Sequence, residues 1–183
     1  MAASASQIRA KAKVYAEVLL EAAQSSDAVF AVANEFDELV ATVRGSKELR
    51  TALADPRSSG QAKKSIVEEV FAGFSTELLE VFAVMVERED LPVLSRAFEA
   101  YMALAEEALG AVIIDVTTVL PLDDALRKQI KDKYSTEFKD EVLLREHIDP
   151  SLIGGIVLSN HGKRIDASVV SQLENARRVL SRT

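Results

Sequence analysis

The spacing of apolar residues changes at Gly110, and this change constrains the fold more than any other feature of the sequence. Before it, apolar residues recur every three or four positions, as in Ile8, Ala12, Tyr15, Leu19 and Ala22. In residues 111–120 they alternate with other residues. The first spacing is typical of an amphipathic helix and the second of a strand. We therefore predict an α+β fold, with a helical bundle over residues 1–110 and a small α/β domain over residues 111–183.

Capping and helix-breaking residues divide residues 1–110 into six predicted helices. Serine and aspartate favour helix N-termini, glycine favours C-termini, and proline either stops a helix or opens one. Such signals occur at Asp27, Gly45, Ser46, Asp55-Pro56, Ser58 or Ser59, Gly73, Ser75 and Pro92. Six helices joined by short turns predict a compact six-helix bundle.

The remaining residues predict a small sheet with two helices. A strand over residues 111–120 is followed by a charged helix that begins at Asp123 or Asp124. Alternation predicts a second strand over Val142–Ile148 and a hairpin that turns at His161-Gly162. The last helix carries an apolar stripe of Val169, Leu173, Ala176 and Leu180, which we expect to pack on the sheet.

Composition excludes several classes of protein. The chain has 183 residues, no cysteine and a net charge of −7, so disulfides and thiolate metal sites are absent. Residues 1–110 hold 11 Lys and Arg against 18 Asp and Glu, whereas residues 111–183 hold 11 of each. An acidic first half repels nucleic acid and anionic membranes. No apolar run approaches the roughly 20 residues of a membrane span, and no secretory signal is expected at the N-terminus.

No arrangement of residues typical of catalysis is found. The sequence has no glycine-rich phosphate loop, and Gly154-Gly155 alone is too short for a dinucleotide site. Neither histidine, His147 or His161, has a partner at the spacing of metal ligands. The Asp123-Asp124 pair is better explained as a helix cap than as an acid–base couple. We therefore predict no active site, no metal and no cofactor.

The fifth predicted helix is apolar around most of its circumference between Phe74 and Val86. One interpretation is a central helix that is covered on all sides. The other is a helix that packs one face in the core and uses another face as the floor of a groove for a partner helix. The first helix adds apolar side chains beside its main stripe, at Val14 and Val18. The spacing alone leaves both interpretations open.

Five motifs in order resemble the δ subunit of F-type ATP synthases, called OSCP in mitochondria. They are Lys13-Val14-Tyr15-Ala16-Glu17-Val18-Leu19-Leu20, Leu53-Ala54-Asp55-Pro56, Val116-Thr117-Thr118-Val119-Leu120-Pro121-Leu122, Asp149-Pro150-Ser151-Leu152-Ile153-Gly154-Gly155 and Ile165-Asp166-Ala167-Ser168. The resemblance covers nearly the whole chain. It departs from the family at Glu89-Asp90, where a Gly-Arg pair is frequent, and at Ser159 and Ala167, where a basic residue and glycine are common.

The resemblance implies a non-catalytic stator subunit. In this family the helical domain binds N-terminal segments of the α subunits on the α3β3 head, and the C-terminal domain binds the C-termini of the b subunits of the peripheral stalk. The implied head-binding residues are Val14, Tyr15, Val18, Leu19, Leu79, Phe82, Ala83 and Val86. The implied stalk-binding residues are Val169, Val170, Leu173 and Arg177.

The resemblance also implies a location in the F1 sector. The missing transit-like N-terminus favours the cytoplasmic face of a bacterial plasma membrane over an organelle. The alternative function is a free-standing helical adaptor that binds an amphipathic partner helix. It shares the bundle and the groove but does not require the C-terminal motifs in register.

Overall fold

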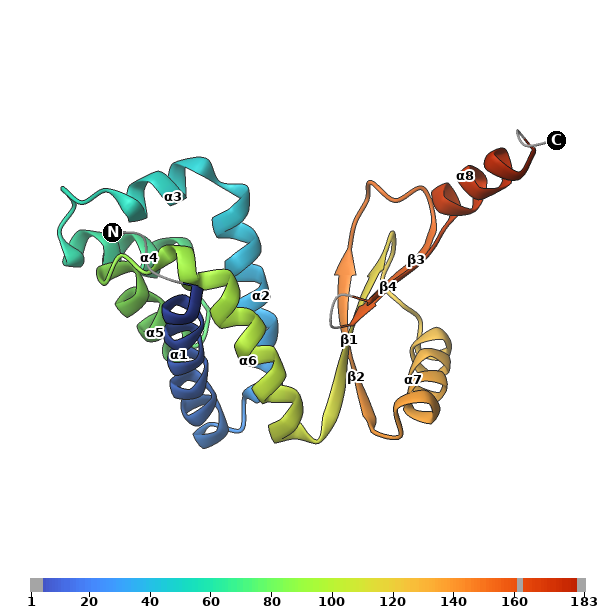
Figure 1. Ribbon diagram of the computed structural model, residues 1–183, viewed down its shortest axis with the longest axis horizontal. Coiled ribbons are helices and arrows are strands. Elements are labelled where there is room, and N and C mark those ends of the chain that lie inside the picture. Colours follow the sequence, from blue (N-terminus) through green and yellow to red (C-terminus); the bar gives the residue numbers. More distant parts are fainter. Residues whose placement is uncertain (1–4, 161–162, 181–183) are drawn as a thin grey trace. The chain divides into compact units, whose positions relative to one another are not determined.

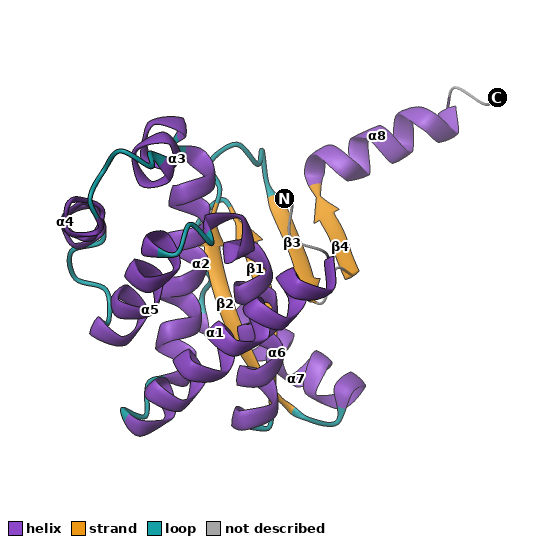
Figure 2. Ribbon diagram, turned by 60° about the vertical axis from the view of Figure 1, so that its left-hand side comes forward, coloured by secondary structure: helices purple, strands orange, loops and turns teal. Residues whose placement is uncertain are grey.

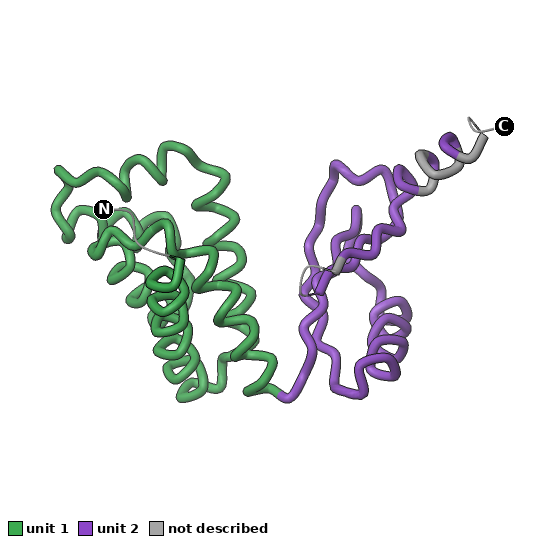
Figure 3. Tube along the Cα trace, viewed as in Figure 1, with its two compact units in different colours: residues 1–109 green, residues 110–183 purple. Residues whose placement is uncertain are grey.

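The computed structural model describes residues 5–160 and 163–180 and divides the chain into two compact units (Figure 1). Unit 1 comprises residues 1–109 and unit 2 residues 110–183 (Figure 3). Gly110, at the boundary, has a left-handed φ of 59°. The fold is α+β, as predicted, because the described residues form helices in unit 1 and a sheet with helices in unit 2.

Unit 1 is built from helices joined by short turns. They are α1 (Ala5–Ser25), α2 (Val29–Gly45), α3 (Lys47–Ala54), α4 (Gly60–Val70), α5 (Thr76–Glu87), the 3-10 helix η1 (Leu91–Val93) and α6 (Leu94–Leu109). Helix α6 packs along α1 and α2, and α4 packs along α5. The helix that we predicted from Pro92 therefore begins with a 3-10 turn and becomes α-helical at Leu94.

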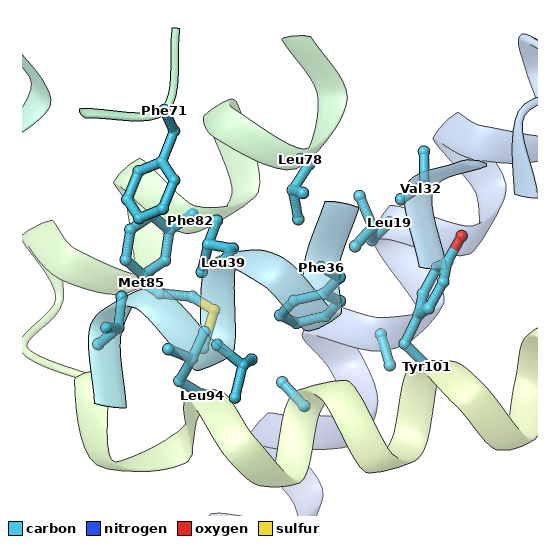
Figure 4. Packing of buried hydrophobic residues seen from close by; sticks show 14 of the residues in the cluster. Leu19, Val32, Phe36, Leu39, Phe71, Leu78, Phe82, Met85, Leu94 and Tyr101 are labelled. Carbon is cyan, nitrogen blue, oxygen red and sulfur yellow. The ribbon is translucent and has the colours of Figure 1, made fainter. Parts of the chain in front are cut away.

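Aromatic and aliphatic side chains from most helices of unit 1 form one core (Figure 4). Phe36 of α2 meets the rings of Phe98 and Tyr101 of α6 edge-on, with centroids 5.3 and 5.9 Å apart. The buried Tyr101 hydroxyl donates a hydrogen bond of 3.0 Å to the Val29 carbonyl, and burial raises the pKa of Tyr101. This bond satisfies a polar group that would be costly to bury alone.

The predicted helix caps are partly confirmed. Ser46 accepts a hydrogen bond from the Leu49 amide and Ser59 one from the Ala62 amide. Ser75 precedes α5, but its hydroxyl donates to Glu35 of α2 at 2.6 Å and makes no cap hydrogen bond.

The prediction that Asp27 caps the second helix is wrong. Asp27 has a φ of 55°, and the residue before α2 is Ala28. Hydrogen bonds from the Asp27 amide to the Gln24 carbonyl and from the Ala28 amide to the Ala23 carbonyl terminate α1. This is the Schellman arrangement, in which the left-handed residue closes the preceding helix.

Unit 2 holds a four-stranded sheet in the order β2-β1-β3-β4 (Figure 2). Its elements are β1 (Ala111–Thr118), α7 (Asp124–Phe138), β2 (Glu141–Ile148), β3 (Gly155–Asn160), β4 (Lys163–Ser168) and α8 (Val169–Leu180). Strands β1 and β2 are parallel and joined through α7, whose N-terminus is capped by Asp123 as predicted. The predicted hairpin pairs β3 with β4, and its turn at His161-Gly162 lies outside the described residues.

A second core lies between α7 and the sheet. It is formed by Ile114, Val116, Leu122, Ile130, Tyr134, Val142 and Leu158. Helix α8 does not contribute the stripe that we expected to cover the sheet, because Leu173 is 62% exposed. The helix follows β4 without a loop and extends away from the sheet (Figure 1).

Candidate interaction surfaces

The described residues contain no group of three or more His, Asp or Glu side chains that could hold a metal ion. His147 lies 3.6 Å from the Asp115 carboxylate on the sheet. Asp123 accepts a hydrogen bond from the Leu126 amide, which assigns it to the cap of α7. No helix of the described ranges is both long enough and apolar enough to cross a membrane.

One side of α1 exposes apolar surface. Val14 and Val18 are 56% and 52% exposed, and they lie one helical turn apart on the same side of the helix. Tyr15 between them is half-buried. Exposed apolar side chains in adjacent turns make this side of α1 a candidate interaction surface.

A polar cluster beside these valines ties α1 to the turn that follows α5. The buried Asp90 carboxylate accepts hydrogen bonds from Lys11 at 2.5 Å and from the Tyr15 hydroxyl at 2.9 Å. Burial and the hydrogen bond to Asp90 raise the pKa of Tyr15, and the nearby Arg88 opposes this shift. Tyr15 therefore lies where α1 meets the end of α5.

Three of the eight predicted head-binding residues are core residues. Leu19, Phe82 and Val86 are all buried, so their side chains present no surface to a partner in this structure. They instead place α1 and α5 in the common core. Leu79 is half-buried and packs against that core. Ala83 is also half-buried, in a hollow between α4 and α5 that includes Gly60 and Glu87.

The sequence did not lead us to predict that the side of α5 on which Arg88 lies is part of a surface. Arg88 interacts with Tyr15, and Val84 and Val81 lie four and seven residues before it, on the same side of the helix. Val84 is exposed and Val81 half-buried. The heptad spacing could have identified this stripe. The interaction of Arg88 with Tyr15 connects the C-terminal end of the stripe to α1, whereas Val84 also lines the hollow between α4 and α5. We call Val14, Tyr15, Val18, Val81, Val84 and Arg88 the α1/α5 surface.

In unit 2, the two glycines and the Asp-x-Ser sequence form the corner from which α8 leaves the sheet. The Gly154 carbonyl accepts a hydrogen bond from the Val169 amide at 3.0 Å. The Ser168 side chain and, after it, the Ser168 amide, which donates a hydrogen bond to Asp166, lower the pKa of Asp166. The Ser168 hydroxyl accepts a hydrogen bond from the Ser171 amide. The motif thus fixes the first turn of α8 against the start of β3.

Helix α8 presents the predicted stalk-binding residues. Val169 and Leu173, one turn apart, are both exposed, as is Arg177 one turn further along. Val170 is half-buried. The side chains of Ala176 and Leu180, which we predicted in the same stripe, lie outside the described ones. The exposed part of the stripe is therefore available to a partner.

Comparisons with known proteins identify the family. Residues 12–180 match the family described as ATP synthase delta (OSCP) subunit. The chain is 32% identical to ATP synthase subunit delta of Anaeromyxobacter sp. (strain Fw109-5), over 92% of this chain and 96% of the relative. It is 29% identical to ATP synthase subunit delta of Flavobacterium johnsoniae, over 91% and 94% of the two chains.

A solved structure shows the same fold. A chain in the Toxoplasma gondii mitochondrial ATP synthase hexamer superimposes with a TM-score of 0.55 and 18% identity, over 92% of this chain and 96% of that one. The match to the family extends through both units, from α1 to the end of α8. The chain therefore belongs to the ATP synthase delta (OSCP) subunit family, whose members are non-catalytic subunits of the ATP synthase peripheral stalk.

Proposed function

We propose that this chain links the catalytic head of a bacterial F-type ATP synthase to its peripheral stalk, at the cytoplasmic face of the plasma membrane. Unit 1 binds N-terminal segments of the α subunits, and unit 2 binds the C-termini of the b subunits. The observation that carries the proposal is that each of two separately packed units has its own exposed apolar surface. A linker needs two such surfaces, whereas the free-standing adaptor needs one.

The α1/α5 surface supports the head contact. Two exposed valines on α1 offer apolar area to one face of an amphipathic helix, and the exposed Val84 adds apolar area on α5 at the edge of the hollow that Ala83 lines. Two cations lie beside this area. Lys11 is paired with Asp90, and Arg88 interacts with Tyr15. An α-subunit segment with an apolar stripe and an acidic residue near Arg88 fits this chemistry.

The exposed stripe of α8 supports the stalk contact. Val169 and Leu173 can pack against an apolar helix, and Arg177 can pair with an acidic side chain of the b subunit. The Gly154 and Ser168 hydrogen bonds fix the direction in which this stripe leaves the sheet. A link that resists rotor torque needs such positioned apolar contact and slow dissociation, and it needs no catalytic group.

The head contact is tested by calorimetry with a peptide of the first ~25 residues of the α subunit from the same genome. Replacing Val18 with Asp puts a charge in the apolar contact, and we expect affinity to fall at least about tenfold, or roughly 1.4 kcal/mol. Val70→Asp on α4 is the matched control, because Val70 is 47% exposed against 52% for Val18. Equal affinities for the two folded variants would exclude the α1/α5 surface as the head contact.

The stalk contact is tested in the same way with a peptide from the C-terminus of the b subunit. We expect Leu173→Glu to weaken binding at least about tenfold. Leu126→Glu on α7 is the control, since Leu126 is also exposed, at 46% against 62%. Deleting residues 170–183 should abolish stalk binding while binding of the α peptide remains; stalk binding that survives the deletion would refute the assignment to α8.

A further inference from the structure

A buried carboxylate beside the α1/α5 surface holds two side chains of α1. Asp90 lies in the turn between α5 and η1. It accepts hydrogen bonds from Lys11 Nζ at 2.5 Å and from the Tyr15 hydroxyl at 2.9 Å. Lys11 and Tyr15 are four residues apart, so they lie on the same side of α1 in consecutive turns. Asp90 therefore fixes two neighbouring side chains of α1 at once.

The backbone of Asp90 is itself held at both ends. Its amide donates a hydrogen bond of 2.8 Å to the Met85 carbonyl, and its carbonyl accepts one of 2.8 Å from the Val93 amide. The side chains of Met85 and Val93 both belong to the core of unit 1. A side chain on a backbone that is supported in this way keeps a precise position. Asp90 is therefore a rigid acceptor, to which the side chains of α1 must come.

The hydrogen bond to Asp90 fixes Tyr15 beside the exposed valines of α1. Val14 precedes Tyr15 directly and Val18 follows it by three residues, and both valines are exposed. Tyr15 is half-buried, so part of its side chain adds to the apolar area of the valines. A side chain that is free to rotate loses this freedom when a partner binds, whereas a side chain that is already fixed does not. Fixing Tyr15 in the free chain therefore favours binding.

Asp90 also determines the charge beside the valines. Lys11 is paired with Asp90, whereas Arg88 interacts with Tyr15 and pairs with no carboxylate in the described ranges. A partner therefore meets one cation that is free to pair with an acidic side chain. The arginine that the resemblance led us to expect at position 90 could accept neither hydrogen bond and would add a third cation.

The competing explanation is that this cluster only holds α1 in the bundle. The core already does so, because Ala12, Ala16 and Leu19 of α1 are buried and α1 packs along α6. Lys11 lies at the rim of this contact, since half of its side chain is exposed. Loss of the cluster should therefore leave α1 in place and change the surface that it presents.

We propose that Asp90 is a positioning residue for the head contact. It acts mainly through Tyr15, which it holds ready to pack on an α-subunit segment. It also neutralises Lys11, so that Arg88 is the cation that pairs with an acidic residue of this segment. This inference rests on the proposed head contact and adds to it the residue that prepares the surface.

The test measures, by calorimetry, how tightly the full chain binds the N-terminal peptide of the α subunit. We expect Asp90→Ala to weaken binding at least about tenfold, because it removes both hydrogen bonds. Glu89→Ala is the matched control, since it removes a carboxylate from the same turn that makes no side-chain hydrogen bond in the described ranges. The affinity of this control should stay within about twofold of the wild-type value.

A double variant shows whether Asp90 acts through Tyr15. Tyr15→Phe keeps the ring but removes the hydroxyl, and we expect it to weaken binding about fivefold. Asp90→Ala should then weaken binding of the Tyr15→Phe chain by less than about threefold, because the hydrogen bond between the two residues is already lost. A purely structural role would lower the free energy of unfolding of each variant but would not couple the two affinities in this way.

The outcomes separate this inference from the proposed function. A wild-type chain that does not bind the peptide would overturn the head contact, and the inference with it. Wild-type binding that Val18→Asp weakens but Asp90→Ala does not would overturn the inference alone. Equal effects of Asp90→Ala with and without the Tyr15 hydroxyl would also overturn it. If Asp90→Ala fails to fold, Tyr15→Phe decides, because an unchanged affinity of this folded variant would overturn the inference and a weakened one would support it.

Discussion

Glu89 occupies a backbone position that glycine fills more easily. Its φ is 57°, and it follows α5, whose end is closed by hydrogen bonds from the Glu89 amide to the Val86 carbonyl and from the Asp90 amide to the Met85 carbonyl. A left-handed conformation costs a residue with a Cβ atom roughly 1–2 kcal/mol. The glycine that the resemblance led us to expect at this position would avoid this cost, which Glu89 carries in this chain.

We therefore expect Glu89→Gly to stabilise the chain by about 0.5–1 kcal/mol, since the relief of strain exceeds the entropy that glycine adds to the unfolded state. Chemical unfolding of the full chain measures the change. The control is Glu80→Gly in the interior of α5, which should destabilise by roughly 1 kcal/mol. A loss of stability at position 89 would contradict the assignment of strain.

Gly155 is required for a different reason. A Cβ atom there would lie 2.5 Å from the Ala167 carbonyl oxygen and 2.7 Å from the Ser168 Cα, and the φ is 86°. We expect Gly155→Ala to destabilise unit 2 by more than about 2 kcal/mol, because both backbone strain and a backbone clash must be relieved. Gly154→Ala meets only a Val169 methyl, at 3.2 Å, and should cost less in the same unfolding measurement. Equal losses would indicate that the close approach is unimportant.

At the scale of elements, the parallel strands β1 and β2 share a contact whose strength depends on pH, because it involves a carboxylate. The Asp115 carboxylate of β1 accepts a hydrogen bond from Arg145 of β2 and lies near His147. Burial alone would raise the pKa of Asp115, but the hydrogen bonds and charges of His147 and Arg145 lower it below its ordinary value of 3.8. Asp115 therefore binds its proton less tightly in the folded chain than in the unfolded one.

The contribution of Asp115 to stability should be complete well above pH 3.8 and should disappear as the pH falls through the lower, folded-state pKa. Hydrogen exchange of the β1 and β2 amides in the full chain, followed from about pH 5 downward, measures this loss. Asp115→Asn should lower protection at pH 5 and flatten its dependence on pH. Asp132→Asn on α7 serves as the control, and a steep dependence that persists in Asp115→Asn would assign the effect to other carboxylates.

At the scale of the whole molecule, the two units have separate cores. Side chains from the helices of unit 1 form its core, and the core of unit 2 lies between α7 and the sheet. Chains of about 70 to 110 residues can bury enough surface to fold alone. We expect fragments 1–109 and 110–183 each to unfold cooperatively, with thermal midpoints within about 5 °C of the matching transitions of the full chain. A fragment 110–183 that unfolds without a cooperative transition would show that unit 2 depends on unit 1.

The sequence by itself determined the periodic and local features of this protein. Spacings of three to four and of two residues predicted helices before Gly110 and strands after it, because side-chain direction follows backbone geometry. The caps at Ser46, Ser59 and Asp123 were predictable because a cap involves residues only two or three positions apart. The motifs predicted the family, which the comparisons confirmed.

The tertiary structure decided which apolar side chains remain at the surface. Six apolar residues of α1 and α5 show this difference. Leu19, Phe82 and Val86 are buried, whereas Val14, Val18 and Val84 are exposed. Periodicity gives the faces of a helix but not the neighbour that covers each face, which depends on contacts distant in sequence such as Tyr15 with Asp90. For the same reason the sequence could not show that α8 leaves the sheet and exposes Leu173, because the corner that directs it joins Gly154 to Val169.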